Sequence, residues 1–193
     1  MDIKKIAVIG GGTMGNGIAH VFAMKGFEVF LTEMNEEFFN RAFKTISGNL
    51  DRQVKKQLIS DDEKIQALEK VHKVIGYENI PTDVNLVIEA IFENKEAKLN
   101  IFKYLENQLN SDCIFASNTS SISITELSAG CRSDRFIGMH FMNPVPVMKL
   151  VEIIRGHSTS DETYNSIKNL TLQFDKEPVE VFDYPGFVSN RIL

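Results

Sequence analysis

Residues 5–23 read KIAVIGGGTMGNGIAHVFA, an apolar run that passes directly into closely spaced glycines. The run predicts a buried strand at residues 5–9, and the segment after the glycines predicts a helix at residues 13–25. Gly10 permits a tight turn, Gly12 allows close approach of a ligand to the backbone, and Gly15 lets the helix pack against the strand. The free N–H groups at the start of that helix suit an anion such as a pyrophosphate.

A second apolar run, residues 28–32, ends at Glu33. An acidic residue at the end of the second strand of such a unit is placed to bind the ribose hydroxyls of NAD, and it would repel the 2′-phosphate of NADP. A glycine-rich turn alone is a weak signal, because such turns are common. Here the strand, the helix and Glu33 support one another, and together they predict an NAD site. The residues of this predicted site are Gly10, Gly12, Thr13, Met14, Gly15 and Glu33.

Composition and charge restrict the class of protein. The chain has 193 residues, 43% hydrophobic and 24% charged, which is ordinary for a soluble globular domain. A net charge of −5 without a long basic run argues against a nucleic-acid surface. No apolar run approaches the length that crosses a bilayer, so no membrane contact is expected. Cys113 and Cys131 are too few for a disulfide framework or a zinc site, so we expect no metal and a reducing, cytoplasmic compartment.

The order of predicted elements alternates strands with helices, which predicts an α/β fold with a doubly wound, mostly parallel sheet of the Rossmann type. Between the second and third strands, residues 36–70 are helical in pattern, heavily charged and too long for a plain crossover. Ser60 and Glu63 predict a capping box within this segment, so we expect an inserted helical hairpin. Thr159 and Glu162 predict another capping box before a late helix. Further strands are predicted at residues 72–75, 84–89, 113–116, 135–139, 149–154 and 178–182, and a helix at residues 94–109.

Polar segments follow three of the predicted strands, at residues 89–94, 117–121 and 140–146. Ligands of an open α/β sheet bind outside the carboxyl ends of its strands, so these segments are predicted to share one rim. Imidazole titrates near neutral pH, so His140 is suited to take the proton that oxidation of a hydroxyl to a carbonyl releases. Glu152 is suited to orient that imidazole. A structural histidine, and a polar loop at residues 117–121 that caps the next helix, are the alternative interpretations.

Taken together, these segments resemble the NAD-binding domain of the 3-hydroxyacyl-CoA dehydrogenases, especially the bacterial 3-hydroxybutyryl-CoA dehydrogenases. The resemblance extends over essentially the whole chain. It implies NAD-dependent hydride transfer between a short-chain 3-hydroxyacyl-CoA, such as 3-hydroxybutyryl-CoA, and the 3-oxoacyl-CoA. The matching segments are residues 10–15 (GGGTMG), 89–94 (EAIFEN), 116–121 (ASNTSS), 140–152 (HFMNPVPVMKLVE) and 185–191 (PGFVSNR).

The resemblance also implies roles for individual residues. His140 looks like the general base of the family and Glu152 like its carboxylate partner. Ser120 resembles the serine that contacts both substrate and nicotinamide, and Asn190 the asparagine that helps to hold the reacting oxygen. The remaining implied contacts are Glu93, Lys98 and Asn143 with the cofactor, and Lys56 and Asn49 with the coenzyme A tail.

Some features of the sequence leave alternatives open. Lys56 is equally well interpreted as part of a solvated helix face, and Asn49 aligns with a serine of the family. Glu33 replaces an aspartate found in many members but keeps the charge. The family carries an all-helical second domain that completes the acyl-CoA cleft and forms a homodimer. We therefore expect residues 1–184 to form the NAD-binding domain, residues 185–193 to begin the second domain, and the chain alone to have weak or no activity.

Two rival functions remain. The first is a non-catalytic NAD-binding protein, such as a sensor or a crystallin-like relative. A protein that only binds NAD needs no proton base, so Ser120, His140 and Glu152 argue against it. The second is another hydroxyacid dehydrogenase built on the same nucleotide fold. Turnover of free 3-hydroxy acids as fast as their CoA thioesters would favour it.

Overall fold

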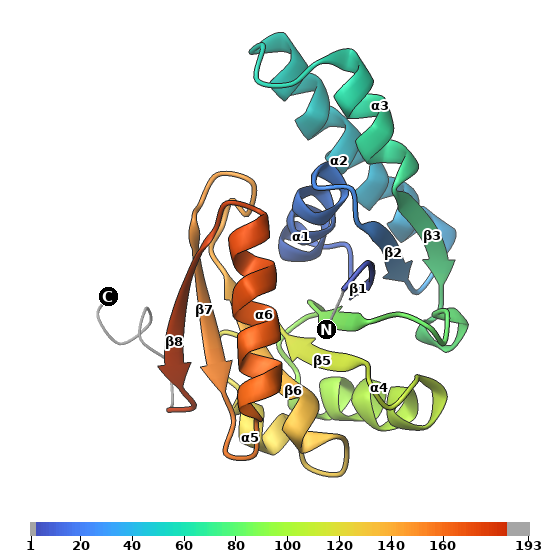
Figure 1. The fold of residues 1–193 in the computed structure, drawn as a ribbon. Coiled ribbons are helices and arrows are strands. Elements are labelled where there is room, and N and C mark those ends of the chain that lie inside the picture. Colours follow the sequence, from blue (N-terminus) through green and yellow to red (C-terminus); the bar gives the residue numbers. More distant parts are fainter. Residues whose placement is uncertain (1–2, 185–193) are drawn as a thin grey trace.

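Eight strands pair in the order β3-β2-β1-β4-β5-β6-β7-β8 in the computed structural model, which describes residues 3–184 of the chain. Strands β1 to β6 are parallel, β7 is antiparallel to β6, and β8 is parallel to β7 (Figure 1). The predicted doubly wound, mostly parallel sheet is confirmed, with a reversed pair at one edge. The strands are β1 (Lys5–Ile9), β2 (Glu28–Glu33), β3 (Val71–Ile75), β4 (Leu86–Glu89), β5 (Ile114–Ser117), β6 (Phe136–Phe141), β7 (Leu150–Arg155) and β8 (Glu177–Phe182).

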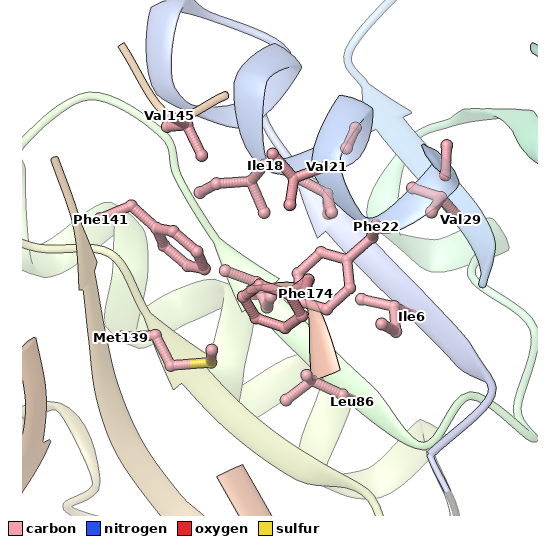
Figure 2. Packing of buried hydrophobic residues seen from close by; sticks show 14 of the residues in the cluster. Ile6, Ile18, Val21, Phe22, Val29, Leu86, Met139, Phe141, Val145 and Phe174 are labelled. Atoms are coloured by element: carbon pink, nitrogen blue, oxygen red, sulfur yellow. The ribbon is translucent and has the colours of Figure 1, made fainter. Parts of the chain in front are cut away.

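Helices cover both faces of the sheet, because parallel strands that are apolar on both sides need a layer of side chains on each. Side chains of α1, α2 and α6 form one core with the sheet, and those of α4 and α5 form a second core. Figure 2 shows the first core, where the Phe22 and Phe174 ring centroids are 4.8 Å apart. The helices are α1 (Thr13–Met24), α2 (Glu36–Lys55), α3 (Asp61–Glu69), α4 (Lys95–Gln108), α5 (Ile124–Leu127) and α6 (Asp161–Gln173), with single 3-10 turns η1 (Tyr77–Asn79) and η2 (Ser133–Arg135).

The predicted hairpin between the second and third strands is confirmed as α2 and α3. Asn35 caps α2 by accepting a hydrogen bond from the Phe38 N–H, and Ser60 and Glu63 form the expected reciprocal capping box of α3. Both helices contact α1, and in Figure 1 the hairpin extends away from the sheet beside that helix. None of the helices between residues 3 and 184 combines the length and apolar character that crossing a membrane requires.

One predicted helix start is wrong. Helix α6 is capped by Ser160, whose hydroxyl accepts from the Thr163 N–H, and not by a Thr159 capping box. The Thr159 hydroxyl is buried and donates to the Phe136 carbonyl, because that carbonyl needs a donor at the start of β6. The alternative interpretation that the polar loop at residues 117–121 caps the next helix is not borne out either, because α5 is capped by Ser123, beyond that loop. At Thr159 the hydroxyl is used elsewhere, which the Thr-x-x-Glu pattern alone does not reveal.

Candidate functional site

The glycine turn between β1 and α1 has the geometry that its sequence predicts. Gly10 adopts a φ of 92°, and its N–H donates to the Thr32 carbonyl over 2.9 Å. A Cβ on Gly15 would lie 1.7 Å from the Gly10 carbonyl oxygen, so this position accepts only glycine. A Cβ on Gly12 would meet no atom within 4 Å. The space at the start of α1 is therefore open to an anionic ligand.

Glu33 ends β2 beside this turn. Its Oε1 accepts a hydrogen bond from the Gly11 N–H over 2.6 Å. The acidic side chain and the glycine turn are therefore joined directly, although 22 residues separate them in the chain. This is the placement that the ribose hydroxyls of a bound dinucleotide require.

A groove of about 450 Å³ opens in front of the glycine turn. Gly12 and Thr13 form its floor, one face of α2 forms one wall, and residues 143–146 form the other. Asn49 lies in the α2 wall, as expected for a ligand contact, whereas Lys56 is exposed at the C-cap of α2 and does not line the groove. The other α2 residues in the wall are Arg41 and Thr45.

Sequence reasoning missed Arg41 and Thr45 as groove residues. Both lie on the same face of α2 as Asn49, because residues four apart in a helix are neighbours. The spacing of positions 41, 45 and 49 was the signal that identifies them. Arg41 is exposed, and its guanidinium lies 5.0 Å from the Phe38 ring centroid. It supplies positive charge at a groove that the α1 N-terminus already favours for anions.

A second cavity of about 380 Å³ brings together five of the predicted site residues. It lies where three polar segments leave neighbouring strands, so the predicted shared rim is confirmed as a structural feature. Asn143 lines both this cavity and the groove, and thus connects them. The predicted residues that line the second cavity are Met14, Glu93, Ser120, His140 and Asn143.

His140 and Glu152 are in direct contact, as the roles predicted for them would require. His140 Nδ1 lies 2.8 Å from Glu152 Oε2. The two residues are opposite each other in the antiparallel register of β6 and β7, and their exposed fractions are 8% and 2%. The prediction that β6 ends before His140 is wrong, because the pairing with β7 continues through Phe141. His140 is thus held by a strand and not by a loop.

Glu93 holds the polar loop that carries Ser120. Its Oε1 accepts hydrogen bonds from the Thr119 and Ser121 hydroxyls and from the Ser120 and Ser121 N–H groups. Burial alone would raise the pKa of Glu93, but the hydrogen bonds from the two hydroxyls and the nearby Lys98 outweigh it and hold the pKa below its usual value. The donors of the Ser120 loop therefore favour the ionised form of Glu93.

Lys98 lies beneath this loop and is only 1% exposed. Its Nζ is 2.6 Å from Glu89 Oε1 and 3.3 Å from Glu93 Oε2. Burial raises the pKa of Glu89, and Lys98 opposes that shift. Lys98 does not line the predicted cofactor site itself. It contacts Glu93, which lines the cavity.

The other candidate groups have local structural explanations. His20 is buried in α1, and burial lowers its pKa to about 4. Cys113 is buried, as expected for a core residue, and burial raises the pKa of its thiol to about 12. Among residues 3–184, no cluster of three or more His, Cys, Asp or Glu side chains is suited to a metal ion. Asn190 lies outside the described residues.

Comparison with known proteins gives a family match over almost the whole chain. Residues 5–184 match the family described as "3-hydroxyacyl-CoA dehydrogenase, NAD binding domain". A 3-hydroxybutyryl-CoA dehydrogenase of Bradyrhizobium diazoefficiens is 45% identical over 99% of this chain and 65% of its own length. A probable 3-hydroxybutyryl-CoA dehydrogenase of Bacillus subtilis is 46% identical over 100% of this chain and 67% of its own.

Solved structures agree with the sequence matches. The (S)-3-hydroxybutyryl-CoA dehydrogenase of Ralstonia eutropha superposes with a TM-score of 0.95 at 42% identity. That comparison covers 99% of this chain and 68% of the other. The chain therefore spans about two thirds of the length of the relatives it matches.

Proposed function

This chain belongs to the 3-hydroxyacyl-CoA dehydrogenase family as an NAD-binding domain, and from that premise we propose that it serves hydride transfer between NAD and a short-chain 3-hydroxyacyl-CoA. The observation that carries this proposal is that His140, in contact with Glu152, lines a cavity that Ser120 and Asn143 also line. A protein that only bound NAD would need no proton base beside its cofactor groove.

In the proposed reaction His140 handles the proton of the substrate hydroxyl. Nδ1 of His140 faces Glu152, so Nε2 is the nitrogen that takes the hydroxyl proton on oxidation and returns it on reduction. The Glu152 carboxylate orients the ring and stabilises its protonated form. Bound NAD would accept the hydride from C3 of the substrate. Ser120 is proposed to contact both substrate and nicotinamide, and Asn190 to help hold the reacting oxygen.

In this proposal NAD and the coenzyme A tail bind to two different surfaces. The glycine turn and Glu33 bind the pyrophosphate and the ribose of NAD, supported by the open space at Gly12 and the Glu33 position. The α2 wall of the groove, with Arg41 and Asn49, is proposed to meet the coenzyme A tail. Lys56, at the C-cap of α2, is proposed to contact the same tail where it leaves the groove.

Further proposals concern the whole protein. Residues 1–184 are proposed to be the NAD-binding domain and residues 185–193 the start of a helical domain. The matched relatives are longer than this chain, which leaves room in them for such a domain. That domain is proposed to complete the acyl-CoA cleft and to form a homodimer. The thiols of Cys113 and Cys131 are free, which supports a reducing, cytoplasmic compartment.

The test measures binding and turnover separately. NADH and NADPH are titrated into the chain by cofactor fluorescence, and NADH consumption is then followed with acetoacetyl-CoA or with free acetoacetate. We expect tighter binding of NADH than of NADPH, slow consumption with the thioester only, and retained NADH binding but a loss of about 10²- to 10⁴-fold in turnover for His140→Gln. Absence of NADH binding, or equal use of free acetoacetate, would contradict the proposal, as would unchanged turnover in His140→Gln.

A further inference from the structure

The loop between β6 and β7 shapes both parts of the candidate site. Residues 143–146 line the groove at the glycine turn, and Met142 and Asn143 line the cavity beside His140. A displacement of this loop would therefore change the cofactor groove and the proton-transfer cavity together. This loop pairs with no strand, so other contacts must hold it in place.

One anchor of the loop is apolar. Val145 is 2% exposed and belongs to the core shown in Figure 2. It packs against α1 at Gly17, where an added Cβ would lie 2.9 Å from the Val145 Cβ. This contact fixes one side chain of the loop, but it does not satisfy the loop's carbonyl groups.

The other anchor is a buried ammonium group. Lys176, immediately before β8, is 6% exposed. Its Nζ donates to the Val145 carbonyl and to the Met148 carbonyl, each over 2.6 Å. These bonds join segments 31 and 28 residues apart in the chain. The loop is also closed internally, since the Met148 N–H donates to the Pro144 carbonyl over 2.9 Å.

Burying the Lys176 ammonium group costs free energy of desolvation. The neighbouring carboxylate, Asp175, forms its own ion pair with Lys25 over 2.6 Å. Burial lowers the pKa of Lys176, because few waters reach the ammonium. Charged donors make stronger hydrogen bonds to carbonyls than neutral donors do, so the two bonds offset the cost of burial. Removing the ammonium would leave two carbonyls without a donor or would release the loop.

We infer that Lys176 is a positioning residue for the active site: it holds residues 142–149 in the shape that places Asn143 between the groove and the cavity. Lys176 touches neither cavity and acts only through the loop. This inference rests on the proposed function for its catalytic meaning, whereas its structural content, the anchoring of the loop, stands on the two hydrogen bonds alone.

The test compares Lys176→Met with Lys25→Met, a matched control that removes an exposed ammonium from the same corner of the molecule. Hydrogen exchange measures the protection of the backbone amides in residues 142–149, and NADH titration measures the affinity of the groove for the cofactor. We expect Lys176→Met to lose protection in residues 142–149 and to bind NADH about tenfold more weakly. Lys25→Met should match the wild type, and Lys176→Arg, which keeps the donors, should recover most of the affinity.

Two results would overturn the inference. One is unchanged exchange of residues 142–149 in Lys176→Met, and the other is an unchanged NADH affinity despite a released loop. If circular dichroism shows that Lys176→Met does not fold, Lys176→Gln, which keeps an N–H donor but not the charge, is measured in its place under the same criteria. If the wild type fails to bind NADH, the proposed function fails, while the exchange data still decide whether Lys176 anchors the loop.

Discussion

Glu152 stands directly opposite His140 in the antiparallel pairing of β7 with β6, and its Oε2 lies 2.8 Å from His140 Nδ1. The strand register therefore orients the imidazole, because directly opposed residues of an antiparallel pair bring their side chains close together. The reversal of β7 relative to the rest of the sheet is what produces this pairing. In a fully parallel sheet the two residues would not face each other in this way.

The first prediction concerns this pair. Glu152→Gln keeps the shape of the side chain but removes the negative charge that is proposed to act on His140. We expect lower turnover of acetoacetyl-CoA with NADH affinity unchanged, and a loss smaller than the roughly 10²- to 10⁴-fold expected when the base itself is removed. Steady-state kinetics and NADH titration check this. Glu177→Gln, an exposed carboxylate at the start of β8, is the control, and equal turnover in the two variants would refute the role of Glu152.

The second prediction separates folding from binding at the glycine turn. Gly15→Ala places a methyl group 1.7 Å from a backbone oxygen, so the backbone must shift and the free energy of unfolding should fall by about 1–3 kcal/mol or more. Gly12→Ala meets no atom within 4 Å and should change stability by about 1 kcal/mol or less. Its methyl group would occupy the predicted pyrophosphate space, so NADH should bind weakly. Urea unfolding and NADH titration give both values, and wild-type affinity in Gly12→Ala would contradict the cofactor placement.

The third prediction concerns the pair of Lys98 and Glu89, whose exposed fractions are 1% and 0%. Lys98→Met leaves Glu89 buried without its cation, which should lower the free energy of unfolding by about 3–5 kcal/mol. The double variant Lys98→Met/Glu89→Gln should lose less. Burial raises the pKa of Glu89, and loss of the cation that opposes this shift should make Glu89 take up a proton more readily, so the deficit of Lys98→Met should shrink as the pH falls. Urea unfolding at several pH values checks this, and a deficit independent of pH would refute the explanation.

The fourth prediction concerns acid and the Ser120 loop. The pKa of Glu93 lies below its usual value of 4.5, so this group stabilises the folded state above that value and loses its contribution as the pH falls through the folded-state pKa. The difference in stability between wild type and Glu93→Gln should be largest near neutral pH and should vanish in acid. Glu96→Gln, which alters an exposed carboxylate on α4, is the control variant. A constant difference for Glu93→Gln would show that its hydrogen bonds to the loop do not require ionisation.

Local rules of sequence account for much of the fold and of the site. The apolar runs, the glycine spacing and the Ser60–Glu63 box depend on residues close together in the chain, so they predicted the strands, the turn and the hairpin. The rule that parallel strands present their carboxyl ends at one edge also placed Ser120, His140 and Asn143 beside one cavity. Where a local rule failed, as at Thr159, the hydroxyl that the Thr-x-x-Glu pattern assigned to a cap donates to a distant carbonyl instead.

The alternation of elements, the glycine turn and the rim of polar segments could be predicted from the sequence, because each follows from backbone propensity and burial over a few residues. Tertiary structure alone decided the register that pairs His140 with Glu152, the burial of Lys98 under Glu93, and the bonds from Lys176 to the β6–β7 loop. A lysine ammonium can donate to many different acceptors, and its partner in the folded protein cannot be predicted from the sequence. That choice depends on strand order and packing between segments far apart in the chain, which only the folded structure brings together.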